Sequence, residues 1–541
     1  MTENDVNTTL ERVRAYHERT KHRLDRYAAG PDFLDWEQQP NPFRQFDTAP
    51  LTKLPLDFTG LADPGLDRIS QHKQQLALAD WGLEELSSLL RFSMGLAAWK
   101  VYGPDRWSLR CNPSSGNLHP TETYLLVCGL QHLNDGIYHY APYQHALELR
   151  AEIPSKPDKQ PQVLVAFSSI AWREAWKYGE RAYRYVQLDI GHAIGALAYS
   201  AAALGYSLQR LPISRTELAK LLGLDRSEDF KDAETEYPDL LFSLTEQTAQ
   251  LPVEIEVAEI DDFAAIRWHG QANRLSDHPN HHWPVIDRLE AALRTCPPCR
   301  QSLLETSIPP PSQIPSPPIR QTILQRRSAQ AFNGKSSLMA ERFYQMLDRC
   351  LPRPSEQPWK GWPYQPKIHL LLFVHRVEGL APGLYLLPRS QQIIPKLKQS
   401  LDPNFSWQAT ADQPTHIPLY QLLSTEVKKV ARALSCHQDI AASSFFSLGM
   451  LAEFDSALQS YGPAAYPELF WEAGLIGQVL YLQAEAHGVR GTGIGCFFDD
   501  AVHEIVGLKD SGLQSLYHFT VGDPKPDNRL QTLPAYDHLE E

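Results

Sequence analysis

The chain has 541 residues and a formal net charge of -13, with 43% hydrophobic and 21% charged residues. This length predicts about two to four domains, and the composition lets each bury a core. The acidic balance argues against a nucleic-acid or anionic-membrane surface, because both require a basic face. The first residues are polar and no apolar stretch reaches membrane-spanning length, so we expect a soluble, cytoplasmic protein.

The N-terminal region differs from the rest of the chain. Residues 31–46, PDFLDWEQQPNPFRQF, are rich in Trp, Phe and Pro, and they show no regular period. We therefore expect residues 1–75 to form an arm that packs on the body of the protein. The sequence does not indicate against what it packs.

Regular patterns begin after this arm. The spacing of apolar residues predicts a helix over residues 83–93, a strand over 123–130, and a turn with a strand over 136–149. A helix of small, mostly Ala residues over 194–204 ends at Gly205, a typical C-cap residue, and must be buried nearly all round. A short strand and an amphipathic helix follow it.

A polar loop precedes the strand at 123–130. Residues 112–117, NPSSGN, combine a Pro that fixes φ, a Gly that permits open backbone angles, and Ser and Asn with short donors and acceptors. Such a loop can wrap a polar planar ligand closely. It can equally be an ordinary turn into a strand.

Residues 296–321, CPPCRQSLLETSIPPPSQIPSPPIRQ, form the stretch richest in proline and have no helical or strand period. We expect a stiff, extended connection between two domains. Its CxxC, Cys296 and Cys299, has no second ligand pair nearby, so no structural metal is expected. Seven scattered cysteines, an odd number, do not make a disulfide framework.

The signals before this connection recur after it in the same order: a helix over 341–351, a strand over 368–377, a turn-strand unit over 383–397 and a small-residue helix over 476–486. Gly191 pairs with Gly474, and Gly223 with Gly507, almost without a gap. This pattern predicts an α+β fold of two tandem domains, over 76–295 and 322–541. Small residues on the buried helices predict an internal pseudo-dimer that packs through them.

Five stretches resemble the nitroreductase superfamily, and within it the SagB/ThcOx-type dehydrogenases that oxidise thiazolines and oxazolines in peptide natural products. They are NPSSGNLHPTETYLL (112–126), GIYHYAPYQHALEL (136–149), WKYGERAYRYVQLDIGH (176–192), RRSAQAF (326–332) and GTGIGCFFDDAVHEIVGL (491–508). The resemblance implies nitroreductase-like domains, each an antiparallel-dominated sheet flanked by helices. It also implies FMN at the interface between protomers.

In the family, an Arg-Arg-Ser segment that opens a helix of one protomer holds the phosphate, and a Pro-Ser-Ser-x-Asn loop comes from the other. Here the first motif occurs only in the second half and the second only in the first half. The equivalent segments, 70–75 and 352–362, depart from both motifs, so we expect one complete site and one FMN per chain. The residues concerned are Arg326, Arg327, Ser328, Pro113, Ser114, Ser115 and Asn117.

The resemblance implies further contacts to the cofactor. A backbone N–H near Cys496 or Phe497 would donate to the flavin N5, with room supplied by Gly493 and Gly495. Lys525 or Arg529 resembles the C-terminal basic residue that completes the phosphate site. Gln330 stands where the family often has a further Arg.

Catalytic residues are implied at Lys177 and Tyr178, a pair that in azoline dehydrogenases assists proton removal as hydride leaves. The alternative is an amphipathic helix whose Lys and Arg face water while its tyrosines pack. His192 is expected to be a hydrogen-bonded core residue, and Cys496 to pack as a small apolar side chain.

Two functions remain open from the sequence. The first is an FMN-dependent oxidoreductase acting on a small or peptide-derived substrate, with NAD(P)H or oxygen as redox partner. The second is a catalytically degenerate nitroreductase-fold binding protein. Protein colour separates them, because only the first requires bound flavin.

Overall fold

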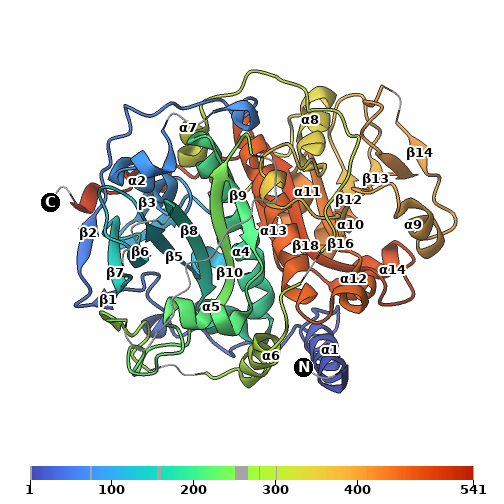
Figure 1. Ribbon diagram of the computed structural model, residues 1–541. Helices are drawn as coiled ribbons and strands as arrows, with labels where there is room; N and C mark the ends of the chain where they lie inside the picture. The colour runs from blue at the N-terminus through green and yellow to red at the C-terminus, as the bar shows by residue number, and fades with distance from the viewer. Residues whose placement is uncertain are drawn as a thin grey trace.

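Two seven-stranded antiparallel sheets lie on either side of a central pair of helices in the computed structural model (Figure 1). The structure describes residues 3–73, 76–154, 160–249, 266–278, 281–299, 301–410 and 412–539. Gln74 and Gln75, which end the expected segment 70–75, and Arg300, within the proline-rich connection, lie outside the described residues.

The two sheets share one strand order. The first runs β2-β7-β6-β5-β8-β10-β9 and the second β14-β15-β13-β12-β16-β18-β17. Without the edge strands β2 and β14, the orders match strand for strand along the chain. The first sheet contains β2 (Leu51–Lys53), β5 (Thr121–Cys128), β6 (Gly136–Ala141), β7 (Ala146–Glu152), β8 (Gln162–Ser169), β9 (Tyr206–Leu211) and β10 (Tyr237–Glu246), and the second contains β12 (Ile368–Val374), β13 (Gly383–Leu387), β14 (Gln408–Ala409), β15 (Tyr420–Ser424), β16 (Phe446–Ala452), β17 (Arg490–Ile494) and β18 (Gln514–Gly522).

The central helices are α4 (Ala182–Ala203) and α13 (Ala465–Ala486), which lie side by side between the sheets (Figure 1). They cross at Gly191 and Gly474. A Cβ atom on Gly191 would lie 2.3 Å from the Trp471 carbonyl oxygen, and one on Gly474 would lie 2.1 Å from that of Leu188. The backbones therefore touch, and the predicted packing through small-residue helices is confirmed.

The remaining helices pack around the sheets and the central pair, and α2 (Leu83–Arg91) and α8 (Ala340–Cys350) contact α4 and α13 respectively. The predicted helices at 83–93 and 341–351 are confirmed by α2 and α8. In the described part of the chain, no helix has the length and apolar character needed to cross a membrane. The others are α1 (Glu3–Arg19), α3 (Ala171–Tyr178), α5 (Arg215–Leu222), α6 (Pro284–Arg294), α7 (Ile319–Gln325), α9 (Ile394–Ser400), α10 (Lys428–Leu434), α11 (Asp439–Ser443), α12 (Phe454–Tyr461) and α14 (Asp499–Ile505).

The C-terminal segment crosses back to the first half. Strand β19 (Gln531–Leu533) pairs with β3 (Leu96–Tyr102), which pairs with β4 (Asp105–Arg110). Accordingly, the C-terminus lies beside the first sheet in Figure 1. The Leu96 N–H donates to the Tyr536 hydroxyl at 3.0 Å, and Trp99 Nε1 donates to the Ala535 carbonyl at 2.9 Å. The end of the chain thus holds the two halves together.

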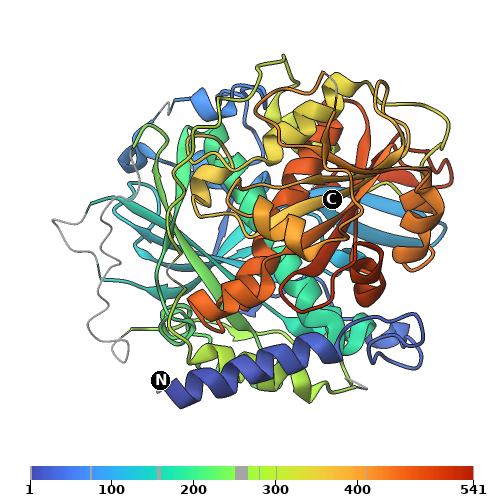
Figure 2. The ribbon, with the colours of Figure 1, turned by 90° about the vertical axis from the view of Figure 1, so that its right-hand side faces the viewer.

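The N-terminal arm also joins both halves. Helix α1 runs along the outside of the molecule beside α6 (Figure 2). Below it, the buried carboxylate of Asp499 pairs with Arg181 at 2.9 Å and with Arg184 at 2.7 Å. Arg181 also donates to the Thr20 carbonyl at 2.7 Å. The alternative in which the Lys and Arg of this helical region face water is therefore wrong for Arg181 and Arg184. Both side chains are buried beneath the arm.

The proline-rich connection is more ordered than its composition predicts. Leu303 forms a β-bridge with Tyr364, and helix α7 begins at Ile319, before the predicted end of the connection. Pro318 precedes the first residue of this helix, a position in which proline costs no hydrogen bond. The prediction of an extended connection over 296–321 is therefore wrong for residues 319–321, which belong to helix α7.

We expect Gly474→Ala to lower the free energy of unfolding by at least about 3 kcal/mol, because the added methyl group meets backbone that cannot rotate away. Chemical denaturation measures the change. Gly30→Ala is the control, since a Cβ atom at Gly30 meets nothing within 4 Å. Equal stabilities of the two variants would contradict the backbone contact.

Candidate functional site

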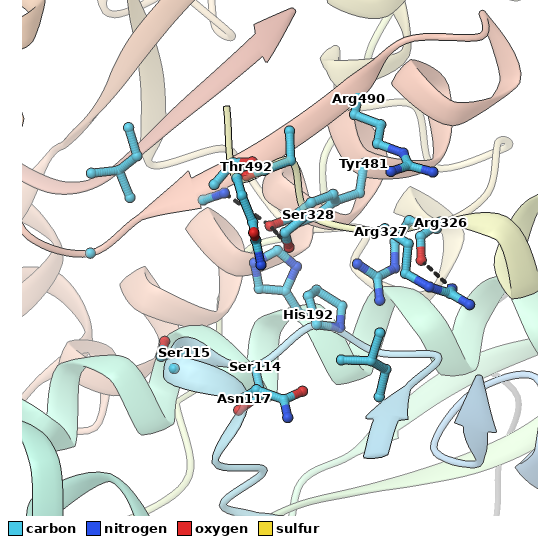
Figure 3. A pocket seen from close by; sticks show the side chains of 18 of the residues that line it. Ser114, Ser115, Asn117, His192, Arg326, Arg327, Ser328, Tyr481, Arg490 and Thr492 are labelled. Carbon is cyan, nitrogen blue, oxygen red and sulfur yellow. Dashed lines mark hydrogen bonds between the residues drawn. The ribbon is translucent and has the colours of Figure 1, made fainter. Parts of the chain in front are cut away.

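A cavity of about 480 Å³ opens between the two halves. Figure 3 shows its two walls, with Ser114, Ser115 and Asn117 on one side and Arg326, Arg327 and Ser328 on the other. His192 of α4 and Tyr481 of α13 also line it, so both central helices contribute. The structure therefore brings together the two motifs that the sequence divides between the halves.

The polar loop of the first half is held by its own side chains. Ser115 donates to the buried Asp189 carboxylate through its N–H and its hydroxyl, each at 3.1 Å. The Asn117 amide donates to the Ser108 carbonyl at 2.9 Å, and Ser114 Oγ accepts from the His119 N–H at 2.8 Å. These bonds fix the shape of the loop. They use one of the two N–H donors of the Asn117 amide.

The Arg-Arg-Ser segment does not open a helix. Helix α7 ends at Gln325, and Arg326 is its C-cap, so the predicted N–H dipoles of a helix start are absent from this segment. Arg326 is buried and donates to the carbonyls of Arg110 at 3.1 Å and Cys111 at 3.3 Å. It thus ties the second half to the end of β4, whereas Arg327 is half-buried.

Six cationic residues line the cavity: Lys100, Arg110, Arg326, Arg327, Arg490 and Lys525. Burial and the charges of Arg327 and Arg490 lower the pKa of Lys100. Burial and Arg326 lower the pKa of Arg327 to about 10. Crowded like charges favour a bound anion, which would relieve their repulsion. No sequence motif marks Lys100 or Arg490, because each is a strand residue that reaches the cavity only through packing.

The acidic side chains nearby do not balance this cluster. Glu485 lies 3.7 Å from Arg490 Nε, and its own pKa is raised by burial. Asp527 is already paired with Arg529 at 2.7 Å. Arg529 is exposed and does not line the cavity, so of the two predicted C-terminal basic residues only Lys525 reaches it.

The end of β17 and the segment after it line the cavity with Gly493, Gly495 and Cys496, but not with Phe497. The Phe497 ring is buried and stacks on His518 at 4.3 Å. A Cβ atom at Gly493 would lie 1.8 Å from the Tyr517 hydroxyl, and one at Gly495 would lie 2.4 Å from Tyr185 Cε1. The space that these glycines supply is therefore taken by tyrosines of the protein itself.

Lys177 and Tyr178 end helix α3 beside the polar loop. Tyr178 lines the cavity, and Lys177 Nζ lies 5.3 Å from the centre of the Tyr178 ring. A Cβ atom on Gly116 would lie 2.5 Å from the Tyr178 hydroxyl and 3.3 Å from Lys177 Nζ. Burial raises the pKa of Tyr178 well above its usual value, so its phenol keeps its proton at neutral pH.

Buried acids lie beneath this corner of the cavity. Burial raises the pKa of Asp189 to about 7 and that of Glu174 well above its usual value. No hydrogen bond that meets standard geometry reaches either carboxyl oxygen of Glu174 from the described residues. His192 fits its prediction as a hydrogen-bonded core residue, since its ring contacts the Tyr517 hydroxyl at 3.0 Å and Gln478 Oε1 at 3.3 Å.

In the first sheet, the position that corresponds to the cavity beside β17 is filled by side chains. Strand β9 occupies the place that β17 has in the second sheet, and its Arg210 lies 5.4 Å from the rings of both Trp362 and Trp471. Arg210 also pairs with Glu468 at 2.5 Å. The Gln357 amide donates to Ser207 Oγ at 2.9 Å. Segment 352–362 thus packs onto β9, where the second half leaves β17 open to the cavity.

Comparison with known proteins agrees with this architecture. Residues 323–523 match the model described as "Nitroreductase family". The chain contains a Nitroreductase family domain. The Methanocaldococcus jannaschii protein named "Putative nitroreductase MJ1384" is 28% identical over 135 residues, which are 23% of this chain and 64% of that relative. The match thus spans less than two thirds of the relative's own length.

The fold of the whole chain also occurs in a solved structure. A crystal structure from Anabaena variabilis, titled as that of "a putative nitroreductase", aligns with a TM-score of 0.67 at 21% identity and covers 95% of this chain and 99% of its own. A chain of the E. coli microcin synthetase McbBCD complex covers 37% of this chain and 70% of its own at 17% identity. Its TM-score of 0.28 is too low to support any argument.

We expect the free energy of unfolding to fall as pH rises from about 4 to about 7, the window between the unfolded and folded pKa values of Asp189. Its folded pKa, about 7, exceeds the unfolded value of 3.8, so its proton favours the folded state below about pH 7. Asp189→Asn removes this dependence. Relative to wild type it should gain about 1 to 4 kcal/mol between pH 5 and pH 8, because one pKa unit corresponds to about 1.4 kcal/mol.

Denaturation curves at both pH values measure this gain. Asp527→Asn is the control, because Asp527 lies in an exposed turn and pairs with Arg529. If wild type and Asp189→Asn showed the same pH dependence of stability, the raised pKa of Asp189 would not be its cause.

Proposed function

We propose that the protein is an FMN-dependent oxidoreductase that binds one FMN per chain in the cavity between its halves. The observation that carries the proposal is the cluster of Lys100, Arg327 and Arg490, half-buried and short of anions, at a cavity of a nitroreductase fold. A phosphate dianion accepts charge-assisted hydrogen bonds from such groups and cancels their repulsion. Members of the Nitroreductase family are typically flavin enzymes, which agrees with this choice of anion.

The remaining lining fits a flavin. A volume of about 480 Å³ lies within the usual range for small-molecule sites. Asn112 Oδ1 is buried on the cavity wall without a hydrogen-bond partner among the described residues, and it can accept from a polar ligand. The backbone N–H groups near Cys496 or Phe497 are the donors proposed for the flavin edge.

Lys177 and Tyr178 are the proposed catalytic pair. FMN, when bound, would supply the centre that gives or takes hydride. Tyr178, kept protonated by burial, would donate a hydrogen bond to the substrate, and Lys177 would hold or accept the proton released beside it. The substrate class is small or peptide-derived, as the SagB-type resemblance implies, with NAD(P)H or oxygen as redox partner.

We also infer that the chain is a tandem pair of nitroreductase-like domains, over 76–295 and 322–541, preceded by the arm 1–75 and joined by 296–321. The shared strand order of the two sheets and the backbone contact between α4 and α13 support this division. Since segment 352–362 fills the matching position on β9, only one flavin is expected per chain.

Purified protein tests the proposal directly. Yellow protein that releases one equivalent of FMN per chain, and that turns over with NAD(P)H or oxygen in a substrate screen, would support it. Two equivalents would contradict the filled position on β9. Colourless protein that FMN cannot reconstitute would contradict flavin binding and favour the binding-protein alternative.

We expect Arg327→Ala to raise the dissociation constant for FMN about tenfold to a hundredfold, because a charge-assisted hydrogen bond contributes roughly 1.5 to 3 kcal/mol. Excess FMN should restore turnover. Fluorescence titration of the flavin-free protein measures the affinity. Arg529→Ala is the matched control, because Arg529 is exposed and paired with Asp527. Equal losses in both variants would refute a phosphate site at Arg327.

We expect Lys177→Ala and Tyr178→Phe to keep flavin stoichiometry while substrate oxidation falls on the order of a hundredfold, the usual scale for a positioned acid or base. Absorbance and rate are read on the same samples. Lys220→Ala, in helix α5 on the first half, is the control and should keep full rate. Full activity in Lys177→Ala on an identified substrate would show that this residue is not catalytic.

A further inference from the structure

Two cysteines stand apart from the other five. All seven are free thiols, and five of them are buried, whereas Cys436 and Cys496 are half-buried. The thiols of Cys436 and Cys496 lie close enough for each to shift the pKa of the other. Cys496 also lines the cavity, so a small molecule in the cavity can reach this pair.

Backbone contacts hold the pair together from both sides. The Phe498 N–H donates to the Leu434 carbonyl at 2.9 Å, and the Gln438 amide donates to the Cys496 carbonyl at 3.2 Å. The connection between α10 and α11 is therefore fastened to the segment after β17 two residues before and two residues after Cys436. These contacts hold the two backbone segments together, so Cys436 and Cys496 are neighbours whatever rotamers their side chains adopt.

The backbone at Cys436 is strained. Cys436 has φ of 50° and the next residue, His437, has φ of 61°, both in the left-handed region that non-glycine residues rarely occupy. Such strain persists only where the surrounding structure enforces it, and it concentrates at functional positions. Here it turns the chain so that Cys436 faces Cys496.

His22 of the N-terminal arm favours the thiolate of Cys496. Its Nδ1 accepts from the Ala28 N–H at 3.0 Å, so the neutral ring carries its proton on Nε2. From there it can donate to the neighbouring Cys496 sulfur, with which the ring interacts. Interactions with Cys436 and His22, and the charge of Arg181, lower the pKa of Cys496. The thiolate is the nucleophile in disulfide exchange.

We propose that Cys436 and Cys496 form a reversible dithiol/disulfide pair that exchanges with small-molecule disulfides entering through the cavity. The Cys496 thiolate attacks one sulfur of the small disulfide, forms a mixed disulfide and releases one thiolate. Cys436 then loses its proton and attacks the Cys496 sulfur, forming the Cys436–Cys496 bond and releasing the second thiolate. Two protein thiols are oxidised, and one small disulfide is reduced to two thiols that take up the two protons.

This inference does not rest on flavin binding. Its test detects disulfide-linked peptides and does not measure turnover. The full chain, with and without added FMN, is equilibrated at a series of reduced and oxidised glutathione ratios, quenched in acid, alkylated and digested. We expect a peptide in which Cys436 is linked to Cys496, with a fraction that follows one two-electron equilibrium. A folded protein in which both cysteines remain alkylated at every ratio would overturn the proposal.

Cysteine variants test which two residues form the disulfide. Cys436→Ser should leave Cys496 as a mixed disulfide with glutathione, because the resolving thiol is missing. The double variant Cys296→Ser, Cys299→Ser is the control, since this buried CxxC should not affect the linked peptide. A linked peptide that uses any other cysteine would overturn the pairing.

The part assigned to His22 is tested in the Cys436→Ser background. We expect His22→Gln to slow alkylation of Cys496 at neutral pH about tenfold, because the thiolate fraction falls when its hydrogen-bond donor is lost. Thermal denaturation checks that the variant is folded. An unchanged alkylation rate in folded protein would overturn the assignment of His22, and an unfolded variant leaves the wild-type peptide result as the deciding measurement.

Discussion

The contact between Gly191 and Gly474 is the constraint on which the rest of the structure depends. It lets two buried helices touch backbone to backbone, and each helix carries residues of the cavity wall next to that crossing. Asp189 and His192 flank Gly191, while Tyr481 lies two turns beyond Gly474. A larger spacing between α4 and α13 would move the two walls of the cavity apart. The shape of the cavity therefore depends on the same backbone contact that packs the helices.

Charge is distributed unevenly over this framework. The protein is acidic overall, yet the cavity gathers cations from both halves, and burial together with their repulsion lowers the pKa values of Lys100 and Arg327. On the far side of the polar loop lie the buried acids Glu174 and Asp189. Folding tolerates both groups without full pairing, which is typical of sites where function rather than stability selects the residues.

The sequence predicted the fold well, because the fold depends on local periods and on small residues. Apolar spacing places α2 and α8, and the Ala-rich pattern identifies both central helices. The candidate site was predicted only in part. Lys100 and Arg490 carry no motif, since a strand residue becomes a cavity residue only through packing. Arg326 was placed at a helix start on resemblance, whereas Pro318 begins the helix earlier and the backbone carbonyls of Arg110 and Cys111 engage its guanidinium.

The filled position on β9 has a consequence for how such a protein can change over time. In a symmetric dimer of identical chains every substitution appears twice, so a residue that blocks one site blocks both. Joining the halves in one chain removes that coupling. Arg210, Trp362 and Glu468 can therefore stabilise one face of the protein while the other face keeps an open pocket.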